Sequence, residues 1–296
     1  MSLPRLSHLL RALLIVATGA AIGGCQQGRD AFAITGTGTL IQFQTDDPGS
    51  LDNELTISGL GSGESVVQID FRPSNEQLYG LTSANRIVTL DPATGVATLV
   101  NTVPFSTDAL NLPVMDFNPP NDFIRVIDYQ PAGADTAILR VNPDTGALIQ
   151  SDGTVLRFND SDINDGEVPQ LAAIAHSNGD RDATATTQYG LDFTTQSLVK
   201  ITNAGVLTTI GVLDRGFVAT AGFDIVRERG DKPEDLGIAY VAIAQRNDNA
   251  RFYEIGLSDG NTSGAASGTN GSEIGNGLQI RSLAVSPKPP KRSGIY

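Results

Sequence analysis

The sequence has little of the chemistry from which many catalytic and metal sites are built. It holds one cysteine, two histidines, two methionines and no tryptophan in 296 residues. A single cysteine excludes an internal disulfide, and zinc or copper sites made of several histidines and cysteines lack their ligands. His176 is the one histidine after residue 24, so a histidine-dependent triad would have to use it. We interpret it instead as a surface residue at a strand end, in register with the turn residue Pro73.

Basic residues are also scarce. The chain has 20 lysines and arginines against 33 acidic residues, and its net charge is −13. Without the first 24 residues, which contain Arg5 and Arg11, the net charge is near −15. Such a surface repels nucleic acid and favours solubility or cation binding, so we expect no nucleic-acid partner. Long helical patterns are missing too, whereas glycine, threonine, valine and aspartate are abundant, as in β proteins with many turns.

The N-terminus has the pattern of a secretory signal over residues 1–24. Arg5 and Arg11 accompany an apolar run at residues 12–22 that is too short to cross a bilayer. The sequence Ile-Gly-Gly-Cys that ends at Cys25 resembles the lipobox of bacterial lipoproteins, which implies cleavage before Cys25 and its acylation. The alternative is an ordinary cleavage site beside a leftover cysteine. Gln26 in place of an aspartate implies, by the same resemblance, anchoring in the outer membrane of an exported lipoprotein.

A repeating unit organises the rest of the chain. Residues 66–103 contain four short strands separated by turn signals, and weaker copies recur before and after them. In the third strand of each copy two apolar residues flank a polar one, which is typical of a half-buried strand, and a turn rich in Asp, Asn, Pro or Gly follows. Five such apolar pairs occur: Ile41/Phe43, Val88/Leu90, Leu139/Val141, Val199/Ile201 and Tyr253/Ile255. Four strands per unit at a period of about 40 to 60 residues predict a β-propeller.

The strand order at the chain ends predicts how the ring closes. Residues 34–57 supply a second, a third and a fourth strand, and residues 280–287 supply a lone first strand. Pairing of these two pieces would close the ring and remove its exposed edges. We therefore predict an all-β fold, a propeller of five four-stranded blades over residues 34–287, with six blades as the alternative. Residues 25–33 would be a lipid-anchored linker and residues 288–296 a disordered tail.

Three aspartates recur at one position of the first strand. They are Asp70, Asp116 and Asp224, each between two apolar residues. Because first strands surround the channel of a propeller, we predict that these carboxylates lie near its mouth and are candidates for a binding site. Paired carboxylates could act in glycoside hydrolysis, or they could hydrogen-bond the backbone of the next blade. A catalytic pair should break the symmetry of a repeat, so we favour the structural role and identify no catalytic residue.

One acidic loop is a weaker candidate, for calcium. The stretch DSDINDGE at residues 160–167 begins like an EF-hand loop. However, Gly166 falls one position late, and Leu171 stands where that motif has glutamate. We favour a solvated acidic loop over weak calcium binding, and we expect no cofactor.

Several stretches together indicate a family. GLTSANRIVTLDPATGVAT, IDFRP, MDFNPPNDFIRVI and LRVNPDTGAL resemble the repeat signatures of a bacterial family known as domain of unknown function 4394. The resemblance covers most of residues 32–287 and is best in the second and third copies, while the fourth copy lacks the first-strand aspartate. It implies a propeller-like fold in a secreted or envelope protein and carries over no catalytic residue.

These patterns favour a non-enzymatic, lipid-anchored binding or scaffolding module of the envelope over an enzyme. The runner-up is a carbohydrate-active hydrolase that uses the channel-mouth carboxylates, and an envelope protein without a discrete ligand is a third alternative. The expected partners are the membrane, through the lipid on Cys25, and an envelope protein or a glycan. We expect a monomer.

Overall fold

The computed structural model describes residues 28–129, 137–151, 155–218, 220–227, 236–245, 249–264 and 271–288. The predicted signal sequence, Cys25 and the predicted tail after residue 288 lie outside the described residues. Strands form nearly all the regular structure, and the one helix in the described part is a short 3-10 turn, η1 (Pro119–Asn121). Within these ranges no helix has the length and apolar character needed to cross a membrane.

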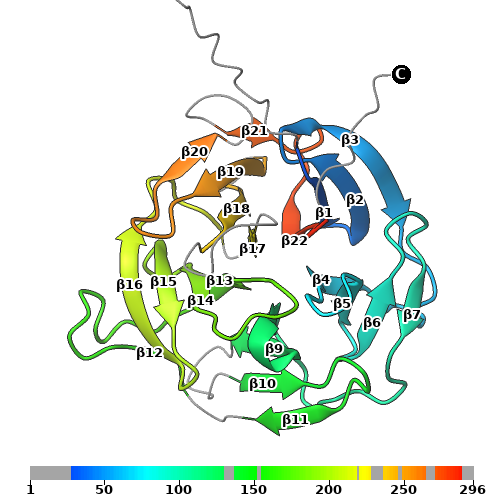
Figure 1. The fold of residues 1–296 in the computed structure, drawn as a ribbon, viewed down its shortest axis with the longest axis horizontal. Helices are drawn as coiled ribbons and strands as arrows, with labels where there is room; N and C mark the ends of the chain where they lie inside the picture. Colours follow the sequence, from blue (N-terminus) through cyan, green and yellow to red (C-terminus); the bar gives the residue numbers. More distant parts are fainter. Residues whose placement is uncertain are drawn as a thin grey trace, which may run out of the picture.

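The strands form five small sheets arranged in a ring, so the prediction of a five-bladed propeller is confirmed (Figure 1). From the axis outward, the second blade consists of β4 (Val66–Phe71), β5 (Leu78–Thr82), β6 (Ile87–Leu90) and β7 (Ala97–Leu99). The third consists of β8 (Leu112–Asn118), β9 (Phe123–Tyr129), β10 (Ala137–Val141) and β11 (Leu148–Ser151). The fourth consists of β13 (Leu171–His176), β14 (Gln188–Asp192), β15 (Ser197–Ile201), β16 (Val206–Val212) and an added parallel strand, β12 (Arg157–Phe158). The fifth consists of β17 (Gly222–Val226), β18 (Ile238–Ile243), β19 (Arg251–Ile255) and β20 (Thr262–Gly264), with β21 (Ser272–Glu273) also paired to β19.

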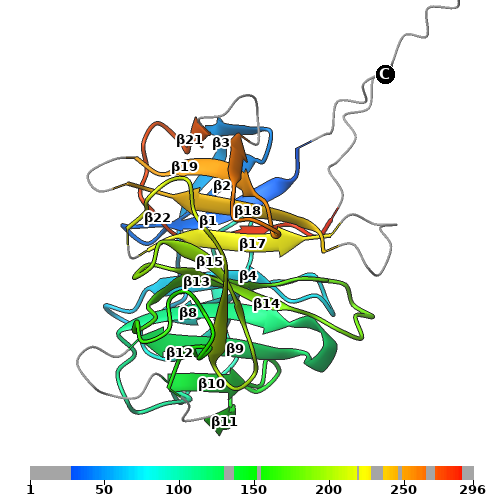
Figure 2. The same cartoon turned by 90° about the vertical axis from the view of Figure 1, so that its left-hand side faces the viewer.

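The first blade closes the ring with strands from both parts of the chain, as predicted. Its order is β22 (Ile280–Val285), β1 (Asp30–Thr35), β2 (Thr39–Gln44) and β3 (Asp47–Thr56). The innermost strand, β22, pairs antiparallel with β1, and Ala31 lies opposite Val285. Strand β1 begins at Asp30, inside the stretch predicted as linker, because its apolar residues are buried between β22 and β2. Seen edge-on, the start of β1 and the end of β22 lie on the same side of the ring (Figure 2).

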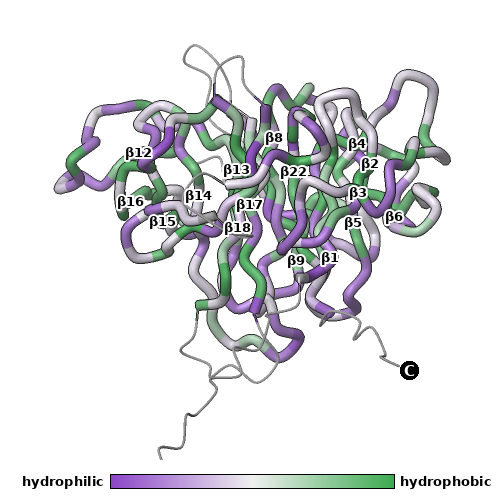
Figure 3. Tube along the Cα trace, turned by 90° about the horizontal axis from the view of Figure 1, so that it is seen from above, coloured by the Kyte–Doolittle hydropathy of each residue, from purple (hydrophilic) through white to green (hydrophobic). Residues whose placement is uncertain are grey.

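The hydrophobic core is divided among the five seams between neighbouring blades. Each of five clusters of buried apolar side chains combines residues from two adjacent blades. Every apolar pair predicted for the third strands is buried, and hydrophobic and hydrophilic residues alternate along many strands (Figure 3). A single four-stranded sheet exposes two faces, so packing against both neighbours is what makes each blade stable.

In the fourth blade, the strand pairing shifts the predicted alignment of the first strand with those of the other blades by two residues. Tyr79 lies opposite Asp70, and the equivalent tyrosine of the fourth blade, Tyr189, lies opposite Ala175. Ala175 therefore occupies the aspartate position, and His176 matches Phe71 and not the turn residue Pro73. The prediction that His176 is a surface residue is wrong, because it is 5% exposed. The first strand of the fourth blade has no aspartate to mark the equivalent position. Its apolar residues alone fit two registers that differ by two residues.

Candidate functional site at the mouth of the central channel

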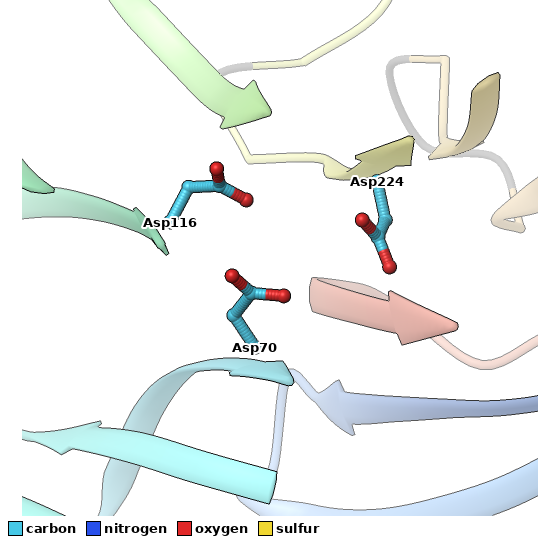
Figure 4. Close-up of side chains that lie close together, drawn as sticks. All are labelled: Asp70, Asp116 and Asp224. Atoms are coloured by element: carbon cyan, nitrogen blue, oxygen red, sulfur yellow. The ribbon is translucent and has the colours of Figure 1, made fainter. Parts of the chain in front are cut away.

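Asp70, Asp116 and Asp224, which we call the acidic triad, come together at one end of the central channel. They lie on the innermost strands β4, β8 and β17 of three different blades. Their carboxyl groups turn toward one another (Figure 4), and one oxygen from each lies within 4.8 Å of the others. All three residues are at most 7% exposed. The predicted convergence of these residues at the channel is what the structure has.

Each carboxylate of the acidic triad also joins its blade to the next one. Backbone N–H groups of the neighbouring innermost strand donate to the carboxylates, in the pairs Phe117 to Asp70 (2.8 Å), His176 to Asp116 (2.8 Å) and Val285 to Asp224 (2.6 Å). Asp70 and Asp224 accept a second bond from the N–H of the residue that follows them, at 2.7 and 2.6 Å. Repeated aspartates thus satisfy backbone groups that would otherwise be buried without a partner.

The two remaining seams are built differently. The aspartate position is Ala175 in the fourth blade and Ala284 in the first, as the strand registers show. Between the first and second blades, the hydroxyl of Ser282 accepts from the N–H of Ile69 at 3.0 Å. Sequence reasoning missed Ser282, because a serine in an apolar strand carries no repeat signal.

The environment of the acidic triad favours the protonated form of its members. Burial, followed by the charges of Asp116 and Asp224, raises the pKa of Asp70 well above its ordinary value. Burial and the charge of Asp224 raise the pKa of Asp116 in the same way. Burial raises the pKa of Asp224 to about 7, although its two backbone bonds and the charge of Arg29 act against this. Three ionised carboxylates so close together need a proton or a cation to compensate their charge.

His176 completes one side of the site. Its Nδ1 lies 2.5 Å from a carboxylate oxygen of Asp116, and its Nε2 lies 3.5 Å from the side-chain amide nitrogen of Asn118. Burial and the nearby charge of Arg125 lower the pKa of His176 to about 3, so the ring is neutral at pH 7. A neutral ring that donates from Nδ1 and accepts at Nε2 satisfies both contacts. The histidine fixes Asp116 in place.

A cavity of about 560 Å³ opens above the acidic triad. Its floor is formed by innermost strands of all five blades, through residues such as His176 and Val285 beside the triad. Its wall includes the segment 178–184 and Arg227. Arg227 donates to Asn178 and to Asp180, both at 2.5 Å, and so ties that segment to the fifth blade. A smaller cavity of about 130 Å³ lies at the other ends of the innermost strands.

The oxygens of the acidic triad are the donors that a hard divalent cation prefers. Each carboxylate accepts a backbone N–H of the next blade. A carboxylate offers about four lone pairs, so each one keeps lone pairs with which it can bind a ligand on the channel axis. Glycoside hydrolysis suits the site less well. One oxygen of each carboxylate lies within 4.8 Å of the others, too close for the pair of an inverting glycosidase, which stands roughly 6.5 to 9.5 Å apart. The roughly 5 to 5.5 Å of a retaining pair is nearer to this spacing, but all three carboxylates are held by the same bonds to the next blade and none is set apart as acid or nucleophile. The site can therefore take up cations or protons more readily than it can carry out a two-carboxylate reaction.

In the acidic loop at residues 160–167, the carboxylate of Asp162 has a structural role. Asp162 accepts from the N–H of Thr209 at 2.7 Å and from the N–H of Asn164 at 3.0 Å, while its Oδ1 also bonds the Thr209 hydroxyl. These contacts hold the loop against β16, and the backbone bonds help to lower the pKa of Asp162. Nothing in the geometry of this loop adds to the weak calcium signal of its sequence.

Comparison with known proteins identifies a family and no activity. A family model described as "Domain of unknown function (DUF4394)" matches residues 39–284, and no curated protein matches the chain. Among solved structures, a structural genomics protein of unknown function from Bacteroides thetaiotaomicron is 14% identical with a TM-score of 0.45; the match covers 78% of this chain and 56% of that one. A chain of a nidogen/laminin complex is 10% identical with a TM-score of 0.46, and the match covers 88% of this chain and 98% of that one. TolB from Acinetobacter baumannii is 11% identical with a TM-score of 0.43, and the match covers 88% of this chain and 67% of that one.

Proposed function

The chain belongs to the family described as domain of unknown function DUF4394, and we propose that it is a non-enzymatic binding module of the bacterial envelope, anchored through a lipid on Cys25. One observation carries the binding role. Three blades each contribute a buried carboxylate to the floor of one open cavity. The lipobox-like sequence before Cys25 supports the anchor, and Gln26 supports the outer membrane.

The ligand that suits this cavity is a cation. Burial raises the pKa values of all three carboxylates, and the charges of neighbouring carboxylates add to this for Asp70 and Asp116. Such a group gains most from a positive charge on the channel axis. Calcium is the first candidate, because it accepts several oxygen ligands in flexible geometry, whereas magnesium demands near-ideal octahedral geometry. A protonated amine on a larger ligand, such as an amino sugar, is the second.

A hydrolase is the runner-up function, and one observation favours it. The raised pKa of Asp70 and Asp116 would keep one carboxyl protonated, as a general acid requires. Against this, all three members of the acidic triad hold the N–H of the next blade in the same way. A residue so fixed cannot easily take on a role that its two equivalents lack.

Calorimetric titration with calcium chloride, and separately with magnesium chloride, tests the binding role. We expect the wild-type chain to bind calcium and the variant Asp116→Asn to lose most of that binding. Asp192→Asn is the matched control, because Asp192 is also fully buried and bonds backbone groups of Gln170 and Thr195 but does not line the cavity. Absence of calcium binding in the wild-type chain, or equal loss in both folded variants, would refute the proposal.

The envelope role needs a separate test on the native protein. Mass spectrometry of the N-terminal peptide should find an acylated Cys25, and Cys25→Ser should release the protein from the membrane fraction. Cross-linking in the native envelope, followed by co-purification, identifies any protein partner. A stoichiometric partner supports a scaffolding role of the exposed loops, and a preparation without one directs attention to small ligands.

A further inference from the structure

The described chain starts at the channel mouth. Gly28 is three residues after Cys25, and its N–H donates to Asp46 at 2.9 Å. The next residue, Arg29, is 5% exposed and donates a backbone N–H to the Thr45 hydroxyl at 2.9 Å. The position of residue 28 is therefore fixed by the fold, next to the start of β1.

The side chain of Arg29 links this starting point to the cavity itself. Its guanidinium donates to the carbonyl oxygen of Arg227 at 3.4 Å and to three carbonyl oxygens after β22, those of Ser286, Pro287 and Lys288, at 3.4 to 3.5 Å. Arg227 and Pro287 both line the cavity above the acidic triad. The chain thus enters the propeller at the rim of the channel mouth, one strand away from the axis, and not at the periphery of the disc.

The tether to the lipid is short. Two residues, Gln26 and Gln27, separate Cys25 from Gly28. The three residue-to-residue steps from Cys25 to Gly28 can span at most about 11 Å, because an extended chain advances by no more than 3.6 Å per residue. An acylated Cys25 would therefore hold the rim of the channel mouth within that reach of the lipid headgroups. The opposite end of the channel cannot approach the same surface, because β8 alone runs over seven residues from Leu112 to Asn118, roughly 20 Å.

Positive charge near the C-terminus also favours contact between the channel mouth and a lipid surface. β22 ends on the same side of the ring as β1 begins (Figure 2), and the sequence that follows, KPPKRSGIY at residues 288–296, contains Lys288, Lys291 and Arg292 and no acidic residue. In a chain with a net charge of −13, this is a local excess of positive charge. Basic side chains next to an anionic leaflet are attracted to it.

We propose that the channel mouth is the membrane-facing side of the propeller, and that the partner of this face is the lipid surface in which Cys25 is anchored. The inference rests on the lipid anchor of the proposed function. The cavity above the acidic triad then opens into the narrow gap between propeller and bilayer. Its ligand must come from that gap, and the loops at the far end of the channel face away from the membrane.

Site-directed quenching on vesicles tests this orientation. The full-length acylated protein is inserted into vesicles of phosphatidylethanolamine and phosphatidylglycerol that contain a headgroup-labelled nitroxide lipid. A fluorophore is attached to Thr184→Cys, an exposed residue of the cavity wall, or to Ala109→Cys, an exposed residue shortly before β8 begins at the far end. The thiol of Cys25 is blocked by its own acyl chain. We expect several-fold stronger quenching at position 184 than at position 109.

The controls separate the orientation from the anchor. The same two labelled proteins with Cys25→Ser should show no vesicle-dependent quenching. Acylated protein in which both positions are quenched equally, or position 109 more strongly, would overturn the orientation and leave the anchor intact. Absence of acyl groups from Cys25 in the mass spectrum would overturn both.

Discussion

Each carboxylate of the acidic triad joins two blades while it stands beside two other carboxylates. The hydrogen bonds that it accepts from backbone N–H groups favour its ionised form, whereas burial favours its protonated form. For Asp70 and Asp116 the charges of neighbouring carboxylates also favour the protonated form. For Asp224 the balance places the pKa at about 7, against 3.8 for the ordinary side chain. Uptake of protons by the folded protein is therefore coupled to its stability.

Stability should fall as the pH rises from about 4 to about 7 in the absence of divalent cations. In that window the folded state keeps a proton on Asp224 that the unfolded state has released, at a cost on the order of 4 kcal/mol by pH 8. Asp70 and Asp116 add to the same trend. His176 opposes it, since its pKa is lowered from 6.5 to about 3 and its contribution is lost as the pH falls below 6.5. The three carboxylates together have a larger effect on the unfolding free energy than the single histidine. The midpoint of urea unfolding in the presence of EDTA should therefore be higher at pH 5 than at pH 8.

Calcium should reverse this loss. At pH 8 a cation on the channel axis takes the place of the protons that the carboxylates have released. Calcium chloride should therefore raise the midpoint of urea unfolding much more at pH 8 than at pH 5. A midpoint that rises from pH 5 to pH 8 with EDTA would show that the carboxylates are stable in their ionised form. The pKa shifts assigned to the acidic triad would then be wrong.

Removal of one triad carboxylate should destabilise the propeller in proportion to the backbone groups left without a partner. Asp224→Ala strands the N–H groups of Ile225 and Val285, and an unpaired buried group costs about 1–3 kcal/mol. We expect a loss of about 2–4 kcal/mol in the unfolding free energy, reduced by the relief of charge repulsion. Asp224→Asn keeps one acceptor and should lose less. Chemical denaturation at pH 7 measures both, and equal stability of both variants and the wild type would exclude the seam role.

At the scale of the strand, close packing between innermost strands sets the width of the channel. Gly222 in β17 lies against β22, where an added Cβ would come within 2.5 Å of the Cβ of Leu283. Gly49 in the outer strand β3 has room, with its nearest neighbour at 3.8 Å. A methyl group at position 222 must push two innermost strands apart.

Gly222→Ala should therefore destabilise the propeller, by about 1–3 kcal/mol, the usual cost of overpacking a core. Gly49→Ala is the matched control, because it is the same substitution in a strand without the clash, and we expect it to be nearly neutral. Thermal unfolding followed by circular dichroism compares the two variants. If they unfold at the same temperature, β17 and β22 are not packed as tightly as the structure has them.

The strand scale is also where the sequence was most informative. The alternation of apolar and polar residues in the third strands predicted five blades, because a period of two residues fixes which side chains face a neighbouring sheet. The three aspartates were predictable as a set, since an acidic residue inside an apolar strand needs a partner. Ser282, His176 and Arg29 were not, because their partners are backbone groups or side chains on other blades. Such contacts depend on how the blades are placed around the ring.

At the scale of the whole molecule, one strand connects the two ends of the chain and two of the five seams. β22 supplies the N–H of Val285 to Asp224 in the fifth blade and the hydroxyl of Ser282 to Ile69 in the second. Its side chains Leu283 and Val285 belong to the core cluster shared with the fifth blade, and Ala284 belongs to the cluster shared with the second. A ring gains stability only when all its seams are closed, so β22 should determine whether the propeller folds cooperatively.

Truncation after Gly277, which removes β22, should abolish the single cooperative thermal transition of the wild type. Four complete blades would remain, but the first would lose its innermost strand and the fifth a seam partner, which leaves apolar surface of both exposed. Truncation after Lys288 is the matched control, because it removes only residues that follow the described fold, and it should unfold like the wild type. Circular dichroism and size-exclusion chromatography compare the two proteins. A monomeric protein that lacks β22 and still unfolds in one sharp transition near the wild-type temperature would mean that each blade is stabilised mainly within its own sheet, and ring closure would then serve the channel mouth rather than the fold.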